Sequence, residues 1–248
     1  VSTGCLWSSW DRMEKEAKKF FKKGKEALNL AKRTYVCKTL EQVVRGFREC
    51  RTNADERAFV KKESAHIRDL FREGDTAFRR RNVLKLLFFH MNGYPTDFGQ
   101  MECLNLCSSP KYKDKRVGYL GMMVLLDENQ ESLFLITNCL KLDLGSSDPT
   151  IIALALTALG DISSAEMLRD LMPEVEKHLA SKTPFVLKKA TLAAVQIARK
   201  VPEAAEYFLG RIPSLLEHRN VAVVLGGLAL VLELASKYPA TLPQLRRM

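Results

Sequence analysis

The chain of 248 residues is long enough to bury a continuous hydrophobic core, in one large domain or two small ones. Hydrophobic residues make up 46% and charged residues 27%, near the averages of globular proteins, which excludes disordered, collagen-like and disulfide-rich miniprotein classes. The longest apolar run, 221–232, is shorter than the roughly 18 uncharged residues of a membrane span. We therefore expect a globular protein without a membrane-spanning helix.

The net charge of +10 lies entirely in the first 90 residues. Residues 1–40 carry 10 basic and 4 acidic side chains, and residues 41–90 carry 12 and 8, whereas residues 91–248 carry 17 of each. A basic pole on a neutral body favours an anionic partner, either nucleic acid or an acidic membrane surface. The six cysteines are scattered and follow no signal peptide, which is typical of reduced thiols in a cytosolic protein.

Helical periodicity dominates the sequence, and no run of period-two alternation predicts a β-strand. We interpret the sequence as a fragment whose residues 1–38 form a basic amphipathic extension. A helix predicted over 13–35 carries lysines, which would lie either on an anionic membrane or in solvent as an additional helix of the fold. The next helices are predicted over 40–50, 55–71, 76–91, 98–108, 113–127 and 131–142.

The remaining sequence contains a repeat. Pro149, Pro184 and Asn220 precede or open apolar helices and are separated by 35 and 36 residues. Neighbouring pairs in a helical-pair repeat have a similar interval and cover both sides of each apolar helix. We therefore predict an all-α protein, a right-handed α-solenoid of HEAT- or armadillo-like helical pairs that runs without a linker over 39–248. Its later helices are predicted over 150–162, 164–180, 185–201, 204–217 and 221–238.

The sequence lacks the motifs of common enzyme sites, including the phosphate loop, the dinucleotide-binding glycines, the zinc-protease helix and the nucleophile elbow. Cys103 and Cys107 share a helix face and would supply half of a metal site, but no second pair completes it. We interpret them as core thiols, and His90 at a helix end as a capping or hydrogen-bonded histidine. We expect no catalysis, cofactor or metal.

Five longer motifs carry a resemblance to a known family. They are VRGFRECRT at 44–52, ESAHIR at 63–68, RNVLKLL at 81–87, GYPTDFGQMECL at 93–104 and DKRVGYLG at 114–121. In this order they resemble the trunk of the large subunits of clathrin adaptor complexes, the adaptins. Further matches, at 94–95, 127–128 and 137–139, are most similar to the gamma-adaptins. The alternative is an alpha-adaptin of plasma-membrane endocytosis. Residues 1–38 have no counterpart in the family.

The resemblance implies a non-enzymatic adaptor that sorts transmembrane cargo during clathrin-coated vesicle formation. The implied partners are beta, mu and sigma subunits in a heterotetramer, an ARF-family GTPase, a phosphoinositide membrane, cargo tails and, indirectly, clathrin. The implied location is the cytoplasmic face of trans-Golgi network and endosome membranes.

Two other interpretations of the basic pole stay open: a nucleic-acid-binding helical repeat protein and a scaffold that binds only proteins. Against nucleic acid, Phe88 and Phe89 lie in an apolar run typical of a core and not of base-stacking platforms.

The resemblance also implies two sets of site residues. Arg48 matches the arginine that helps bind the acidic residue of cargo signals of the form [Asp/Glu]-x-x-x-Leu-[Leu/Ile], while a sigma subunit would bind the leucines. The alternative is a solvated helix arginine. A second set matches a cluster that contacts phosphoinositide head groups, with a solvated charged surface as the alternative. It consists of Arg79, Arg80, Arg81 and Lys85.

Overall fold

The computed structural model describes residues 37–74, 76–125, 132–162, 164–201, 203–239 and 243. The helix predicted over 13–35 lies outside these residues. The chain forms two compact units, residues 1–59 and 60–248, and the boundary between them falls inside the helix α3, Asn53–Arg72.

The described part of the first unit consists of α2, Leu40–Glu49, and the start of α3. A capping box opens α2, because Thr39 Oγ1 accepts the N–H of Gln42 at 3.2 Å and Gln42 Oε1 accepts the N–H of Thr39 at 2.8 Å. Gly46 on α2 faces the ring of Phe59 on α3, and a Cβ at position 46 would lie 3.0 Å from that ring. The small residue therefore allows the two helices to pack closely.

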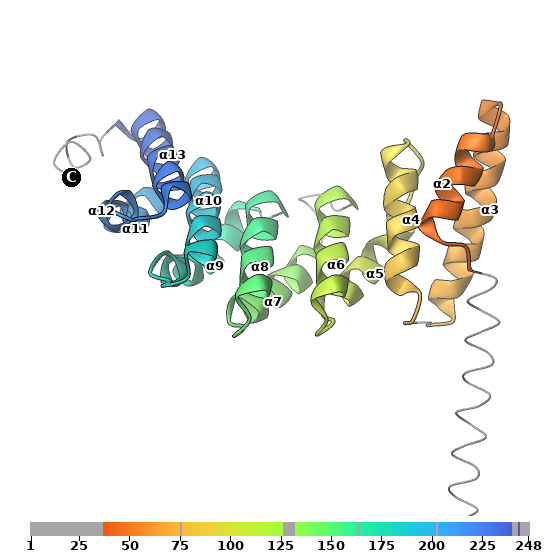
Figure 1. The fold of residues 1–248 in the computed structure, drawn as a ribbon, viewed down its shortest axis with the longest axis horizontal. Coiled ribbons are helices and arrows are strands. Elements are labelled where there is room, and N and C mark those ends of the chain that lie inside the picture. Colours follow the sequence, from red (N-terminus) through yellow and green to blue (C-terminus); the bar gives the residue numbers. More distant parts are fainter. Residues whose placement is uncertain are drawn as a thin grey trace, which may run out of the picture. The chain divides into compact units, whose positions relative to one another are not determined.

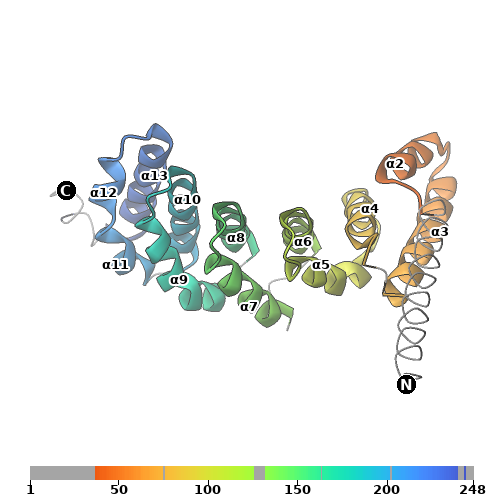
Figure 2. The ribbon, with the colours of Figure 1, turned by 60° about the horizontal axis from the view of Figure 1, so that its bottom comes forward.

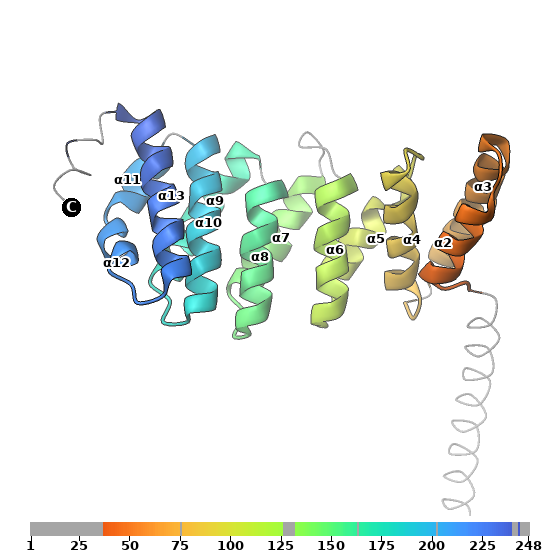
Figure 3. The same ribbon diagram turned by 45° about the horizontal axis from the view of Figure 1, so that its top comes forward.

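The second unit has two layers of helices. In one layer α4, α6, α8, α10 and α13 lie side by side, and α5, α7, α9, α11 and α12 form the other (Figures 1 and 2). Figure 3 shows the first layer as a continuous row. The bounds are α4 Arg79–Met91, η1 Asp97–Gly99, α5 Gln100–Cys107, α6 Tyr112–Leu125, α7 Ser132–Leu144, α8 Pro149–Ile162, α9 Ala165–Leu179, α10 Pro184–Lys200, α11 Ala204–Leu209, α12 Ile212–Leu216 and α13 Val221–Lys237.

This architecture confirms the predicted α-solenoid. The described residues contain no β-strand. None of the helices within the described ranges combines the length and apolar character needed to cross a membrane. Helices of the two layers pair, and the pairs repeat along the second unit. Among the described helices of the first layer, α6, α8 and α10 therefore have a neighbouring helix on both sides, whereas α13 packs against α10 alone.

Ion pairs between successive repeats recur at the repeat interval. Arg199 Nε lies 3.0 Å from Glu233 Oε2, 34 residues further along the chain. Arg211 Nη2 lies 3.2 Å from Glu176 Oε1, 35 residues earlier. These separations agree with the interval predicted from the prolines and Asn220, so the periodic spacing also positions surface charges against their counterparts in the next repeat.

The predicted stop after the helix 76–91 is confirmed at Gly93. This residue has φ of 83°, a left-handed conformation that glycine adopts without steric cost. Its N–H donates to the carbonyl of His90 at 2.9 Å, and the next N–H, of Tyr94, donates to the carbonyl of Phe89 at 3.1 Å. The two bonds form a Schellman motif, which satisfies carbonyls that the end of α4 leaves unpaired.

The single helix predicted over 204–217 is wrong, because the structure has two short helices there, α11 and α12. Pro213 has no backbone N–H and is tolerated only in the first turn of a helix, so a new helix begins next to it. Periodicity did not reveal the break because Phe208, Ile212 and Leu215 keep a helical spacing, and all three are buried.

Two glycines of α6 let it approach α5 closely. A Cβ on Gly118 would lie 2.7 Å from the backbone nitrogen of Cys107 and 2.9 Å from the carbonyl oxygen of Cys103, and a Cβ on Gly121 would lie 2.5 Å from Cys103 Sγ. Both cysteines are fully buried, which confirms their interpretation as core thiols. Burial raises the pKa of Cys103 to about 12 and also raises the pKa of Cys107.

A buried polar network joins α5, α6 and α7. Lys115 Nζ lies 2.8 and 3.0 Å from the two carboxylate oxygens of Asp143 and donates to the carbonyl of Cys107 at 2.7 Å. The hydroxyl of Tyr119 donates to Asp143 Oδ2 at 2.7 Å. Burial, reinforced by this hydrogen bond, raises the pKa of Tyr119, so the phenol remains a donor. The charges in this network are paired and hydrogen-bonded.

The outer face of α13 is apolar and exposed. Its exposed side chains follow one another at intervals of 4, 3 and 4 residues, which places them in one stripe along the helix. They are Val221, Leu225, Leu228 and Leu232, with exposed fractions between 45% and 70%. The helix α10, which belongs to the preceding repeat, packs against α13.

We expect Asp143→Ala to lower the free energy of unfolding by about 3–5 kcal/mol, because the ammonium of Lys115 would stay buried without its counter-ion. Tyr119→Phe removes one hydrogen bond and should lower the free energy of unfolding by about 1 kcal/mol. Urea denaturation of the chain measures both changes. The double replacement Lys115→Met with Asp143→Leu is the control, since removing both charges should cost less than Asp143→Ala alone. A larger loss in the double variant would contradict this account.

Candidate anion-binding site

Three consecutive arginines open α4 at the surface of the second unit. Phe78, just before them, is buried and anchors this turn in the core. Successive helix residues point about 100° apart, so the three side chains diverge. The guanidinium of Arg81 lies 5.2 Å from the centre of the Phe78 ring. The side chains of Arg79 and Arg80 instead approach α5 and α6, and they are 20% and 46% exposed.

Arg79 and Arg80 have carboxylate partners on neighbouring helices. Arg79 forms an ion pair with Glu102 of α5. Arg80 Nη1 lies 2.9 Å from Asp114 Oδ1 in the first turn of α6, and the hydroxyl of Ser109 donates to Asp114 Oδ2 at 3.2 Å. The positive charge is therefore partly compensated, and both arginines are held by contacts with α5 and α6.

A depression of about 490 Å³ lies beside these ion pairs, between the start of α4 and the turn from α5 to α6. We call this depression the basic pocket, and its lining includes Arg79, Arg80, Ser109, Lys111 and Asp114. Lys111 is exposed, and its ammonium forms no ion pair with a residue that the structure describes. Among the described lining residues, three cations thus face one depression with one carboxylate, that of Asp114, an arrangement that favours an anion such as phosphate.

Lys85 does not share this surface, contrary to its predicted place beside Arg81. Its side chain is fully buried, and Lys85 Nζ lies 3.4 Å from Asn82 Oδ1. The reason is that Lys85 shares a helix face with Asn82 and Phe89, three residues before it and four after it, and both of these side chains are buried. Phe88 is half-buried, so neither phenylalanine presents a fully exposed ring.

Arg48 belongs to the first unit and lies in the last turn of α2. Its side chain is exposed and has neither a hydrogen bond nor an ion pair with any described residue. Arg45, one turn earlier, is instead paired with Glu41 at 3.4 Å. A cation near a helix C-terminus is favourable to the helix, and the guanidinium of Arg48 keeps its donors available for a carboxylate.

The remaining histidine and cysteine predictions concern structural groups. His90 Nδ1 lies 3.2 Å from Thr96 Oγ1, which confirms a hydrogen-bonded histidine. In the described ranges, no group of histidine, cysteine, aspartate and glutamate side chains is arranged to hold a metal ion.

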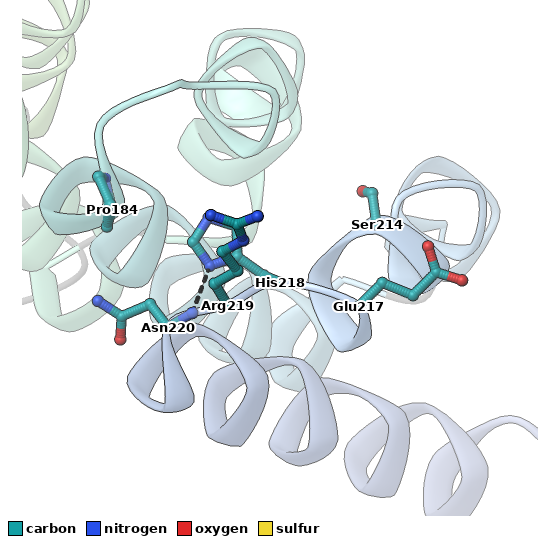
Figure 4. Close-up of a pocket in the computed structure, with 6 residues that line it drawn as sticks. All are labelled: Pro184, Ser214, Glu217, His218, Arg219 and Asn220. Carbon is teal, nitrogen blue, oxygen red and sulfur yellow. Dashed lines mark hydrogen bonds between the residues drawn. The ribbon is translucent and has the colours of Figure 1, made fainter.

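A second depression, of about 720 Å³, opens at the turn before α13 (Figure 4). Its polar groups take part in local capping: His218 Nδ1 accepts the N–H of Asn220 at 3.0 Å, and Asn220 Oδ1 accepts the N–H of Ala222 at 2.9 Å. Figure 4 shows the carboxylate of Glu217 pointing away from Arg219, so the lining groups do not converge on one point. The basic pocket is therefore the better candidate for ligand binding.

Sequence reasoning missed Lys111, Ser109 and Asp114 as neighbours of the arginines. A signal for the pairing exists, because Asp114 follows Arg80 by 34 residues, close to the repeat interval found later in the chain. Extending that interval backwards to α4 and α6 would have placed this carboxylate against this arginine.

The fold defines the class of protein as an α-solenoid, and comparison with known proteins gives the family. The model of the adaptin N terminal region matches residues 56–246. This chain belongs to the adaptin N-terminal family.

The relatives support the gamma-type resemblance. The chain is 49% identical to the AP-1 complex subunit gamma of Dictyostelium discoideum, over 79% of the chain and 22% of that protein. It is 51% identical to the AP-1 complex subunit gamma-1 of Arabidopsis thaliana, with the same coverage. A homology model of the full-length AP-3 complex in an intermediate open conformation superposes with a TM-score of 0.60 at 30% identity, covering 69% of this chain and 30% of that one. The chain spans about a fifth of the length of these curated relatives.

Proposed function

We propose that this chain is part of a gamma-type large subunit of a clathrin adaptor complex, which sorts transmembrane cargo at trans-Golgi and endosomal membranes. The observation that carries the proposal is the identity of about half of its aligned residues to AP-1 gamma subunits over 79% of the chain. In this role the chain is a non-enzymatic, peripheral membrane component. Its partners are beta, mu and sigma subunits, an ARF-family GTPase and, through the complex, clathrin.

Purification of the tagged chain from cells tests this assignment. We expect beta, mu and sigma subunits to copurify with it, and the type of mu subunit to distinguish a gamma-type from an alpha-type complex. RNase and DNase treatment provides the control. Recovery of a nuclease-sensitive complex with nucleic acid, and without adaptor subunits, would contradict the proposal.

The exposed Arg48 supports binding of acidic dileucine cargo signals together with a sigma subunit. Its guanidinium is a planar fork of donors suited to a carboxylate, and it does not have to leave a partner among the described residues first. A signal aspartate or glutamate would meet a cation whose helix end already favours positive charge.

We expect Arg48→Ala to weaken binding of an acidic dileucine peptide to the sigma-containing complex by about 1–3 kcal/mol, the range for a hydrogen bond to a charged group. Arg48→Glu should weaken it further by placing like charges together. Peptide binding is measured by fluorescence anisotropy.

The control is Arg57→Ala, an exposed arginine of α3 in the same unit, which should leave binding unchanged. Replacing the acidic residue of the peptide with lysine should partly restore binding to Arg48→Glu. If Arg48→Glu bound the acidic peptide as well as the parent does, Arg48 would be an ordinary surface arginine.

The arginines at the start of α4 support phosphoinositide binding at the basic pocket. Each lysine or arginine beside an anionic bilayer contributes about 1 kcal/mol to the free energy of membrane binding. Arg79 is unsuited to charge reversal, because a glutamate there would face Glu102 and damage the contact with α5. Neutralising Arg80 and Arg81 therefore tests lipid binding with less disturbance of the fold.

We expect Arg80→Gln with Arg81→Gln to weaken binding to vesicles that contain phosphatidylinositol 4-phosphate by about 2 kcal/mol, since two cations are lost. Vesicle flotation measures the bound fraction. The matched control, Lys182→Gln with Lys188→Gln, removes two exposed charges elsewhere in the second unit and should change binding much less. Equal loss in both pairs would reduce the cluster to a nonspecific charged surface.

A further inference from the structure

Asp114 occupies donors that a phosphate in the basic pocket would use. Its Oδ1 lies 2.9 Å from Arg80 Nη1, and its Oδ2 accepts the hydroxyl of Ser109 at 3.2 Å. The side chain is only 18% exposed and is paired with Arg80, so this carboxylate is a fixed group in the wall of the pocket. Lys111 lines the same depression and has no such counter-ion within the described chain.

A phosphate monoester and a carboxylate compete for the same kind of donor. Both accept hydrogen bonds from guanidinium and hydroxyl groups, and both are negatively charged at neutral pH. An incoming phosphate must therefore displace Asp114 from Arg80 or bind beside it at the cost of like-charge repulsion. Among the described residues that line the pocket, Lys111 is the cation whose full charge faces an incoming ligand without such an exchange.

We infer that Asp114 is an internal competitor in the basic pocket, which lowers its affinity for a phosphate monoester of a lipid head group, and that Lys111 supplies the first uncompensated charge for that phosphate. This inference rests on the proposed phosphoinositide binding of the same cluster. Removing the carboxylate charge frees the Arg80 guanidinium for the ligand, while removing Lys111 deprives the ligand of its first contact.

A purely structural role for Asp114 predicts the opposite change in ligand affinity when its charge is removed. Asp114 lies in the first turn of α6, where an acidic residue stabilises the helix dipole. If its task were only to orient Arg80, neutralising it would release the arginine from the pocket and weaken ligand binding. The direction of the change in affinity therefore separates the two roles.

The experiment compares Asp114→Asn with the parent chain in flotation with phosphatidylcholine vesicles that contain phosphatidylinositol 4-phosphate. We expect binding about two- to fivefold tighter, the size of one exposed ion pair, with a small fall in melting temperature. Asp161→Asn, an exposed aspartate of α8, is the control for net charge. Asp114→Ser is the second variant, because serine is also tolerated at a helix start and removes the same charge.

Lys111→Gln should weaken binding about fivefold, and the neighbouring exposed Lys113→Gln, outside the pocket lining, should change it less. Inorganic phosphate is titrated in parallel, and a Lys111-dependent effect with phosphate alone, without vesicle binding, would overturn the lipid assignment.

The results distinguish failure of the competitor role of Asp114 from failure of the proposed phosphoinositide binding. If Asp114→Asn and Asp114→Ser bind no more tightly than Asp161→Asn, while Arg80→Gln with Arg81→Gln still weakens binding, the competitor role is overturned and phosphoinositide binding stands. If none of these variants changes vesicle binding, both the competitor role and the proposed lipid binding of the cluster are overturned.

Discussion

The close contact between α5 and α6 is the constraint on which the candidate site depends. Gly118 and Gly121 leave no side chain between the helices, and the backbone of Cys107 lies where a Cβ at position 118 would be. Adding side-chain atoms to a packed core typically lowers the free energy of unfolding by about 1–3 kcal/mol, so the spacing at this contact is fixed within narrow limits. That spacing positions Glu102 of α5 and Asp114 of α6 against the start of α4, where they hold the arginines of the basic pocket.

The charges of the second unit illustrate how burial decides the role of a lysine. Lys115 is buried but has a carboxylate and a carbonyl within 3 Å, so its charge is compensated and ties three helices together. Lys111, four residues earlier, is exposed at the rim of a depression and has no counter-ion within the described chain. The first contributes to the packing of the solenoid, and the second is available to a ligand.

Membership of the adaptin N-terminal family and the proposed activity stand on different observations. The match over 56–246 and the identity to AP-1 gamma subunits concern the chain as a whole. The proposed binding of cargo and lipid depends on single side chains, and the two candidate sites lie in different units. Arg48 is free of intramolecular partners in the described chain, whereas Arg79 and Arg80 must exchange theirs, so the two sites differ in the energetic cost of engaging an anion.

The sequence by itself determined the all-α class, most helix positions, the repeat interval and the family, because apolar periodicity, Pro149, Pro184, Gly93 and long motifs are local signals. It did not reveal the break at Pro213, since the apolar spacing continued through it. The tertiary structure alone decided which basic residues share a surface. Lys85 lies one turn from Arg81 yet is buried, while Lys111, 30 residues away, lines the same depression as Arg80. Helix packing sets these distances, and sequence separation does not encode them.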